Sequence, residues 1–429
     1  MTASVFQILP TTQKYDWGKI GLTSKVAQFA DAAKAPGFQL DEKSPYAELW
    51  MGTHSSSPSR LLDGTPLKDV LASAPSLIGD DVLNIFEVDD GNLPFLFKIL
   101  AIRKALSIQT HPDKRMAERL HAERPDLYKD ANHKPEMAIA LTPFTALCGF
   151  LPLPQIATYL TSTPEFASLL PATAISNFLA NSGSHTPTGE TEKDALKELF
   201  SALMSADPSK YQPELAKLVK RYREGEVKEA EMHVKELVLQ LESQYPGDIG
   251  VFCAFVLNYM RLSPGEAIFL GAGEPHAYIS GDIVETMATS DNVIRAGLTP
   301  KLRDVPSLLE NLTYVAAEST KHIVAPKPFG TISTIYDPPI PEFSVVRARL
   351  SGVPEEVHDA LKGPSLFIVT EGSGKLTWEG EGGEDGEELS AGKVFFVGAN
   401  TRIRFETTAT LEVYRAFVES KPPSPPQQL

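Results

Sequence analysis

A block of helix-type sequence set between strand-type segments constrains the fold most strongly. In DALKELFSALMSA and in PELAKLVKRYREGEVKEAEMHVKELVLQLESQ, apolar residues recur every three or four positions, as on one face of an amphipathic helix. The run TPE at 163–165 is a helix-start pattern, and Pro-Gly at 246–247 ends the block. Because strand-type sequence lies on both sides, we expect residues 152–246 to form a helical module inserted into a β domain.

The remaining sequence predicts two β units. Short runs rich in apolar and β-branched residues precede the helical block (LPFLFKILAI, KALSIQTH, MAIALTPFTALCGF) and follow it (VFCAFVLNYMRLSPGEAIFLGAGEPHAY). We expect residues 1–151 and 247–325 to form one unit, and residues 326–420 a second. The acidic run EGEGGEDGEE at 379–388 should be a solvated hairpin loop, and residues 421–429 a flexible tail.

The two β units share a weak internal repeat. SPGEAIFLGAGEPHAY at 263–278 aligns with SAGKVFFVGANTRIRF at 390–405: a glycine turn, an apolar strand, a second glycine turn and another strand. This pattern is typical of a cupin-type jelly roll, a small barrel that can hold a metal ion. The second copy has Asn-Thr-Arg where the first has Glu-Pro-His, so we expect only the first to bind metal. The predicted fold class is mainly β with α: cupin-like jelly-roll β domains plus an inserted helical domain.

Composition narrows the class of protein. A length of 429 residues suggests two or three domains, and a formal net charge of −15 argues against nucleic-acid and membrane partners. The N-terminal sequence lacks the basic start and apolar core of a signal peptide, and no apolar run approaches the ~20 residues that cross a bilayer. We expect a cytoplasmic monomer in which Cys148 and Cys253 are buried, reduced thiols.

Several metal-ligand side chains occur in the strand-type segments. Alternation along ALSIQTH places Ser107, Gln109 and His111 on one face of a strand. His276 follows a tight turn in GEPHAY, and Glu136 ends YKDANHKPE. Each has an ordinary alternative: a polar strand face, a structural histidine or a surface ion pair. Together, in a chain with nine His, they predict a divalent site, and imidazole with carboxylate suits Zn²⁺.

Charge at this site favours catalysis on an anionic substrate. With Glu136 as the only anionic ligand, Zn²⁺ keeps a net charge of about +1 and polarises a substrate oxygen. Arg295, Lys301 and Arg303 follow the turn SDN, and Lys134 lies two residues before Glu136. Cations beside a metal and a serine suggest a phosphate-bearing substrate. A solvated basic edge is the alternative.

Two longer segments resemble the signature segments of type I phosphomannose isomerases. They are YKDANHKPE at 128–136 and HAYISGDIVETMATSDNVIRAGLTPK at 276–301. Supporting similarities are YDWG at 15–18, ELWMGTHSSSPS at 48–59 and ALSIQTHPDK at 105–114. The resemblance runs across the chain, is weakest in the helical module and the C-terminal β unit, and is closest to fungal members.

The resemblance implies an activity and a set of roles. It implies one Zn²⁺ per chain and an aldose–ketose isomerase acting on a small sugar phosphate, interconverting mannose 6-phosphate and fructose 6-phosphate and supplying the former for GDP-mannose and glycan synthesis. The implied zinc ligands are Gln109, His111, Glu136 and His276. Arg295 matches the catalytic arginine. The implied phosphate-binding residues are Ser107 and Lys301, and the further pocket positions are Trp17, Glu48, Lys134, Glu285 and Asp291.

The chemistry of such an isomerase requires a general base. A proton must leave the carbon beside a carbonyl, which gives an enediol or enediolate. The guanidinium of Arg295 stays protonated, so its expected role is electrostatic. Glu285 and Lys134 are the candidate bases, with Glu285 preferred. Two rival readings remain: a cupin oxygenase with Fe(II), and a non-catalytic sugar-phosphate sensor. An isomerase assay with and without a chelator separates them.

Overall fold

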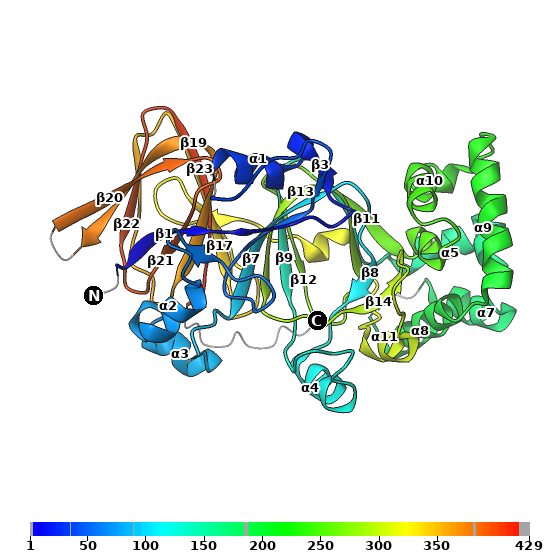
Figure 1. The fold of residues 1–429 in the computed structure, drawn as a ribbon. Helices are drawn as coiled ribbons and strands as arrows, with labels where there is room; N and C mark the ends of the chain where they lie inside the picture. The colour runs from blue at the N-terminus through cyan, green and yellow to red at the C-terminus, as the bar shows by residue number, and fades with distance from the viewer. Residues whose placement is uncertain (1–2, 35, 89, 184–187, 381–382, 420–429) are drawn as a thin grey trace.

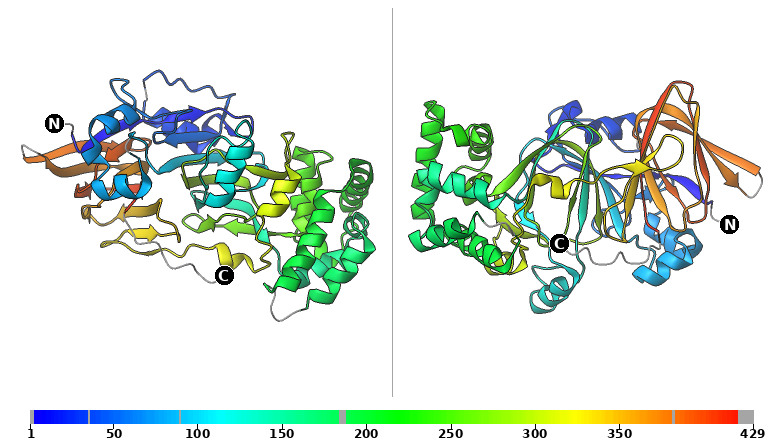
Figure 2. Two further views of the ribbon diagram at one scale, coloured as in Figure 1. Left: turned by 90° about the horizontal axis from the view of Figure 1, so that it is seen from below. Right: turned by 180° about the vertical axis from the view of Figure 1, so that it is seen from behind.

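The computed structural model describes residues 3–34, 36–88, 90–183, 188–380 and 383–419. Two large antiparallel sheets form the body of the molecule, and a group of helices lies at one end (Figure 1). Views from below and from behind show the same order, with the C-terminal strands at the end opposite the helices (Figure 2). The predicted fold class, mainly β with α and with an inserted helical domain, is confirmed, and the paired strands of both sheets are antiparallel.

In the central sheet, six strands pair one after another, and four further strands pair with one another and with β13. The path runs through β2 (Thr11–Gln13), β5 (Glu48–Met51), β7 (Phe95–Ile102), β13 (His276–Ala288), β10 (Phe144–Phe150) and β11 (Leu257–Leu262). The further strands are β8 (Ile108–Thr110), β9 (Glu136–Ala140), β12 (Ala267–Leu270) and β14 (Ile294–Gly297). A small separate sheet joins β3 (Lys19–Ile20) to β4 (Pro45–Tyr46).

Strand β7 shows how the two faces of this sheet differ. Its sequence FLFKILAI is buried along its whole length. Alternation sends Phe97 and Ile99 to the core shared with the C-terminal strands, and Leu100 and Ile102 to the opposite, interior face. Lys98 has the same parity as Leu100, so its side chain also belongs to the interior face.

The second sheet contains the C-terminal strands. Its path runs through β15 (Lys327–Pro328), β16 (Thr334–Tyr336), β17 (Ser344–Ser351), β23 (Thr410–Phe417), β19 (Ser365–Gly380), β21 (Val394–Val397), β1 (Val5–Leu9) and β6 (Arg60–Leu61). Off this path lie β18 (Glu355–His358), β20 (Gly383–Ser390) and β22 (Ile403–Glu406).

The strand β1 pairs with a strand of the C-terminal unit, although the sequence grouped residues 1–151 with 247–325. β1 pairs antiparallel with β21, with Val5 opposite Val397, and β6 pairs with β1. β1 thereby hydrogen-bonds an edge of β21 that would otherwise be unpaired. Hydrophobic pattern predicts that a strand exists but not which sheet it joins, and the grouping of residues 1–151 with 247–325 as one domain stays a prediction.

Residues 152–246 contain only helices among the elements that the structure describes. They are α5 (Leu153–Ser162), α6 (Pro164–Ala167), α7 (Ala172–Asn181), α8 (Glu190–Met204), α9 (Pro208–Arg223), η3 (Glu229–Glu231) and α10 (Lys235–Gln244). Arg221 of α9 bonds both Glu165 and Glu231, with Nε to Oε1 of Glu165 at 2.8 Å and Nη2 to Oε1 of Glu231 at 2.7 Å. This buried network ties α6, α9 and η3 together.

The apolar run VFCAFV after the helical block is a 3-10 helix, not the predicted strand. It forms η4 (Ile249–Phe255), every residue of which is buried. Phe252 and Phe255 both stack near the ring of Phe166, at centroid distances of 6.3 and 5.4 Å. Asp248 caps this helix by accepting from the amide of Gly250 at 2.7 Å. A fully apolar run has no period that separates strand from helix, which explains the error.

The N-terminal third, predicted as mainly β, also contains helices. They are η1 (Gly21–Thr23), α1 (Lys25–Ala32), α2 (Leu67–Ser73), η2 (Pro75–Leu77), α3 (Asp80–Phe86) and α4 (Lys114–Glu123). Ser24 caps α1 and Asp113 caps α4 by accepting from main-chain amides at 3.3 and 2.7 Å. The later helical elements are α11 (Val305–Asn311) and η5 (Ser319–His322).

Other expectations have mixed outcomes. The acidic run at 379–388 is not a loop where it is described, because β19 and β20 pair through it, with Glu379 opposite Glu384. Residues 381–382 and 421–429 lie outside the described residues. Cys148 and Cys253 are buried, free thiols, as predicted. Within the described ranges, no helix has the length and apolar character of a membrane span.

Candidate metal centre

Three strand ends bring the predicted ligands together. Glu136 is the first residue of β9, His276 is the first of β13, and His111 directly follows β8. β13 pairs with β8 and with β9, placing Gln109 opposite His276 and Glu136 opposite Met287. Glu136 is also opposite Leu270 of β12, and the turn that leads from Leu270 to His276 bonds to the carbonyl of His111 through the amide of Gly273 at 2.9 Å, so the three segments converge.

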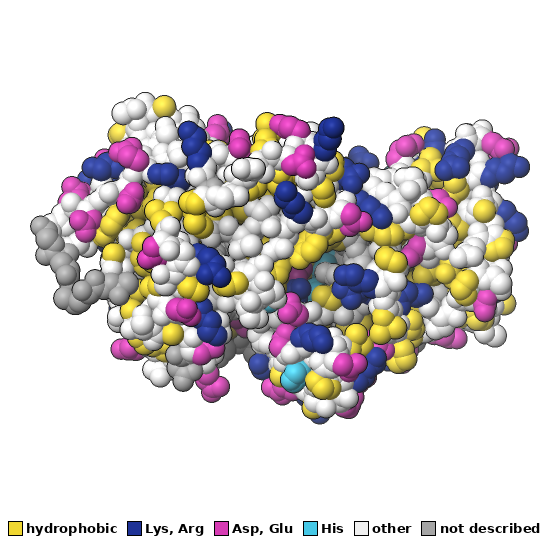
Figure 3. Space-filling model, viewed as in Figure 1, with side chains coloured by type: hydrophobic (Ala, Val, Ile, Leu, Met, Phe, Trp, Pro, Cys, Tyr) yellow, Lys and Arg dark blue, Asp and Glu magenta, His cyan; other side chains and the backbone are white. Residues whose placement is uncertain are grey.

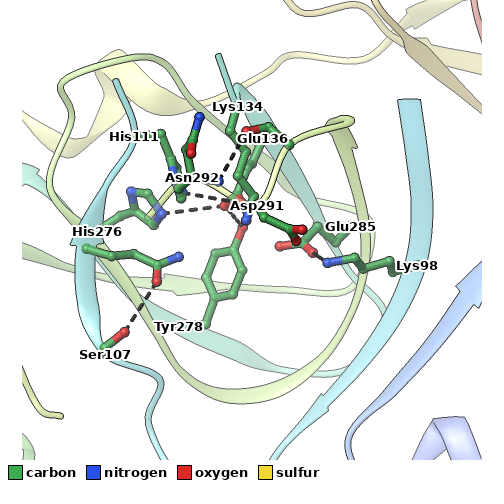
Figure 4. A network of polar contacts seen from close by, with 12 residues as sticks. Lys98, Ser107, His111, Lys134, Glu136, His276, Tyr278, Glu285, Asp291 and Asn292 are labelled. Atoms are coloured by element: carbon green, nitrogen blue, oxygen red, sulfur yellow. Dashed lines mark hydrogen bonds and ion pairs between the residues drawn. The ribbon is translucent and has the colours of Figure 1, made fainter. Parts of the chain in front are cut away.

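The three side chains share one small volume. Nε2 of His111 lies 3.4 Å from Oε1 of Glu136, and Nε2 of His276 lies 3.4 Å from Oε2 of the same carboxylate. One ligand atom from each residue lies within 4.8 Å of the others, and all three residues are buried. Figure 4 shows both imidazole rings turned toward the carboxylate. This geometry allows all three to bind a single ion.

Main-chain carbonyls fix the tautomer of both imidazoles. Nδ1 of His111 lies 2.7 Å from the carbonyl oxygen of Asn292, and Nδ1 of His276 lies 3.0 Å from that of Glu274. A carbonyl only accepts, so each Nδ1 carries the hydrogen and each Nε2 presents a lone pair. Both Nε2 atoms are buried and have no hydrogen-bond partner in the described chain. Unpaired buried lone pairs aimed at a carboxylate fit a divalent cation.

The protonation states of His111 and Glu136 are those that metal ligands require. Burial lowers the pKa of His111 to about 4, which leaves a neutral imidazole near pH 7. Burial alone would raise the pKa of Glu136, but contacts with His111, His276 and the Lys134 ammonium hold it well below its usual value. Nζ of Lys134 lies 3.6 Å from Oε1 of Glu136. The centre therefore offers the neutral imidazole of His111 and the carboxylate of Glu136.

Two further groups border the three ligands. The amide oxygen of Gln109 accepts from the Ser107 hydroxyl at 3.3 Å, on the strand that carries His111. The hydroxyl of Tyr278 donates to Oε2 of Glu136 at 3.4 Å. Gln109 is the cross-strand neighbour of both His276 and Arg295. Its role as a fourth ligand stays a prediction.

A buried charge cluster on the interior face contains a residue that sequence reasoning missed. Nζ of Lys98 lies 3.2 Å from Oε2 of Glu285 and 3.4 Å from Oε2 of Glu48. Nε1 of Trp50 also donates to Glu48, at 2.5 Å. Burial would lower the pKa of Lys98, but the carboxylates of Glu48, Glu285 and Glu136 raise it above its ordinary value. The available signal was a lone lysine inside the apolar run FLFKILAI.

Glu285 differs electrostatically from Glu136. It is buried, and burial raises its pKa, with Glu136 and Glu48 adding to the rise and Lys98 opposing it. Figure 4 shows Glu285 directed toward Lys98 on one side of the centre. A carboxylate with a raised pKa gains and loses protons closer to neutral pH than an exposed one.

A cavity of about 400 Å³ adjoins the centre. Six predicted residues line it: Trp17, Glu48, Ser107, Gln109, Arg295 and Lys301. Figure 3 shows a hollow on this face, near β8 and β14, with Lys and Arg side chains along its edge. Burial lowers the pKa of Arg295. Among the described residues, the side chains of Arg295 and Lys301 have no hydrogen bond or ion pair, which leaves both for a ligand.

Arg303 does not belong to this cation group. Its Nε donates to the carbonyl of Ala296 at 2.6 Å, and its Nη2 donates to that of Met204 at 2.8 Å. The guanidinium therefore anchors the chain after β14 to helix α8, and Arg303 is not among the residues that line the cavity.

Asp291 lines a second cavity. This cavity, of about 820 Å³, lies among the loops before β7 and β9 and after β13, and its walls include His54, Asn132 and His133. Oδ1 of Asp291 lies 3.4 Å from Nε2 of His54, and that hydrogen bond is the main reason its pKa is lowered. Lys134 and Glu285 line neither cavity. The predicted residues thus fall into one metal centre, one buried charge cluster and two cavities.

Comparison with known proteins matches this arrangement to one family. The models of the type I phosphomannose isomerase catalytic domain, helical insertion domain and C-terminal region match residues 5–153, 171–257 and 333–380. The mannose-6-phosphate isomerase of Cryptococcus neoformans is 48% identical, over 98% of this chain and 100% of that protein. That of Schizosaccharomyces pombe is 41% identical, over 97% and 100%.

Solved structures with the same fold include bacterial and metal-bound proteins. A mutant of phosphomannose isomerase from Salmonella typhimurium superposes with a TM-score of 0.80 at 29% identity, over 97% of this chain and 100% of that chain. A zinc-bound mannose 6-phosphate isomerase superposes with a TM-score of 0.78 at 29% identity and the same coverage.

Proposed function

The chain belongs to the type I phosphomannose isomerases, and we propose that it interconverts mannose 6-phosphate and fructose 6-phosphate with one Zn²⁺ bound by His111, Glu136, His276 and Gln109. The observation that carries the metal assignment is the pair of buried imidazole Nε2 atoms that lack a protein partner and face one carboxylate. Bound zinc supplies Lewis-acid polarisation of a substrate oxygen.

The cavity beside the centre fits the substrate end that carries the phosphate. Arg295 and Lys301 are cations without a partner in the described structure, and Ser107 adds a hydroxyl to the same lining. Arg295 lies opposite Gln109 in the pairing of β14 with β8, so we place its guanidinium beside the reacting carbons and Lys301 toward the phosphate. There Arg295 stabilises negative charge that develops on the enediolate oxygens.

Glu285 is the proposed general base. Its raised pKa and buried position favour proton transfer near neutral pH, and the adjacent Lys98 ammonium stabilises the carboxylate once the proton has left. Lys134 is the alternative, but its ammonium contacts the proposed zinc ligand Glu136. The proton moves from C2 of the aldose to Glu285 and returns to C1 through a cis-enediol.

The remaining parts of the proposal concern the location of the enzyme, its partners and its metabolic role. We place the enzyme in the cytoplasm as a monomer that acts on a small sugar phosphate and binds neither nucleic acid nor membrane. The formal net charge of −15 supports the absence of polyanionic partners. The family supports a supply of mannose 6-phosphate for GDP-mannose and glycan synthesis.

A coupled isomerase assay with and without a chelator tests the function. We expect turnover of mannose 6-phosphate that is lost with the metal and restored by Zn²⁺. His276→Ala should lose bound zinc and roughly 100-fold or more of its activity, since even outer-sphere changes cost 10–100-fold. Metal content by elemental analysis is read beside activity. Full turnover by a metal-free chain would refute the zinc role, and a chelator-sensitive uptake of oxygen would favour an oxygenase.

A further inference from the structure

The loop before β8 brings another cation to the 400 Å³ cavity. Lys104 lines this cavity together with Arg295, Lys301 and Ser107, and it is absent from the set expected from sequence. Its ammonium has no carboxylate or hydrogen-bond acceptor within ion-pair distance in the described part of the chain. Lys104 is therefore a third cation of the cavity without an anionic partner.

An aromatic ring from the helical module holds this ammonium. Nζ of Lys104 lies 4.2 Å from the ring centroid of Tyr245, and an ammonium at this distance is attracted by the negative face of the ring. Tyr245 directly follows α10 and lines the same cavity. The contact directs a flexible lysine side chain to one position at the cavity wall.

Two other segments of the chain hydrogen-bond the main chain at Lys104 and Ala105. The Tyr245 hydroxyl donates to the carbonyl of Ala105 at 2.5 Å, and the Gln244 side-chain oxygen accepts from the amide of Ala105 at 2.8 Å. On the other side, the amide of Lys104 donates to the carbonyl of Trp17 at 3.1 Å. The end of α10 and the Trp17 loop thus hold the segment that leads to Ser107.

The acidic residues of the cavity do not neutralise this cation group. Glu48 is engaged by Lys98 at 3.4 Å and by the Trp50 indole at 2.5 Å. Asp16, which also lines the cavity, is exposed, and its carboxylate forms no ion pair with Lys104 within 4.0 Å. Lys104, Arg295 and Lys301 therefore present their charge to a dianionic ligand.

We propose that Lys104, held over Tyr245 by the helical module, binds the phosphate of the substrate together with Lys301. The helical module is then part of the binding site: it sets the affinity for a phosphorylated sugar and leaves the chemical step unchanged. The identity of the ligand as a sugar phosphate rests on the proposed function above.

Charge removal at position 104 tests the proposal. Lys104→Met keeps the side-chain length and should raise KM for mannose 6-phosphate about tenfold, the effect of one charge-assisted hydrogen bond, with kcat little changed. Lys104→Arg keeps the charge and should stay close to the unaltered enzyme. Lys220→Met removes one charge from an exposed position of the same helical module and should leave KM unchanged. An unchanged KM in Lys104→Met would overturn the proposal.

Two variants of Tyr245 separate the ring from the hydroxyl. Tyr245→Phe loses only the bond to Ala105, whereas Tyr245→Leu also loses the ring under the ammonium. We expect the step from Phe to Leu to raise KM severalfold in the unaltered background and to have little effect in the Lys104→Met background. Equal effects of that step in both backgrounds would contradict a role through Lys104.

Binding of inorganic phosphate separates this proposal from the isomerase function. Titration calorimetry on the purified full chain should show weaker phosphate binding by about tenfold in Lys104→Met and no change in Lys220→Met. If the chain binds phosphate in this way without isomerising mannose 6-phosphate, the cation site stands and the isomerase function fails. If the chain isomerises the sugar but phosphate binding is the same in all variants, the role of Lys104 fails alone.

Discussion

At the scale of single residues, the metal centre is set by backbone carbonyls as much as by the ligands. The carbonyls of Asn292 and Glu274 hold Nδ1 of His111 and His276 and leave both Nε2 atoms free. Because the orienting atoms belong to the main chain, substitution of Asn292 or Glu274 does not remove them directly. Tautomer and ring direction therefore depend on the path of the loops, which the strand ends fix.

Hydrogen exchange between solvent and substrate carbon identifies the base. Glu285→Gln should abolish exchange at C2 while zinc remains bound, because the amide cannot accept the proton. Lys134→Met should retain exchange at a lowered rate, since Lys134 contacts the ligand Glu136 rather than the proposed path of the proton. The exchange is followed by NMR in deuterated water. A normal rate in Glu285→Gln together with loss in Lys134→Met would assign the base to Lys134.

At the scale of elements, the strand-type segments that carry the metal-ligand side chains were predictable, and the pairing of those segments was not. Strand parity predicted that Gln109 and His111 share one face; in the structure Gln109 lies in β8 and His111 directly follows it. Sequence analysis missed Lys98 and Lys104 because their roles depend on which strand or helix packs beside them. Tyr245 reaches the cavity only through the packing of α10 on the loop before β8, a contact with a separation of 140 residues in sequence.

Helix α9 illustrates the same dependence on distant partners. The guanidinium of Arg221 contacts the carboxylates of Glu165 and Glu231, and Glu231 also accepts from Thr163 at 2.8 Å. Sequence periodicity predicts the helix and its apolar face. It does not show that Arg221 of this helix contacts two carboxylates from two other helices, α6 and η3.

Arg221→Met should weaken the helical module. The change leaves two carboxylates, one of them fully buried, without their cation, and the loss of one partner of such a network costs about 3 kcal/mol. Denaturant unfolding monitored by circular dichroism measures the free energy of unfolding. Lys220→Met, on the same helix but exposed, is the matched control and should change it by about 0.5 kcal/mol or less. Equal values for the two variants would show that the network adds no stability.

At the scale of the whole molecule, the C-terminal unit buries a histidine in polar contact with a serine and an arginine. His358 is buried between the Ser333 hydroxyl, 2.9 Å from Nε2, and the Arg415 guanidinium, 3.3 Å from Nδ1. A guanidinium only donates, so Nδ1 accepts and Nε2 carries the hydrogen. Glu274 and His276 of the first repeat have no counterpart there, and no metal-ligand group occurs among the described residues of this unit.

The free energy of unfolding should decrease as the pH falls, and protonation of His358 is the expected cause. Burial, with the charge of Arg415, holds the pKa of His358 well below its ordinary value of 6.5. The unfolded chain therefore binds a proton that the folded chain excludes, and stability is lost as the pH falls below about 6.5, by about 1.4 kcal/mol per pH unit. Denaturant midpoints between pH 7.5 and 5.5 measure this loss. His358→Gln should show a shallower slope, and an identical slope would assign the acid sensitivity to other groups.

Because β1 pairs with β21, part of this fold forms only when two distant segments of the chain have both been synthesised. β1 pairs with residues 394–397, which the ribosome makes long after β1 itself. Until β21 has been made, β1 can pair only with β6, and the edge that later pairs with β21 stays open. A nascent chain that stalls before β21 therefore leaves one edge of the apolar strand β1 unpaired, where a holdase chaperone can bind.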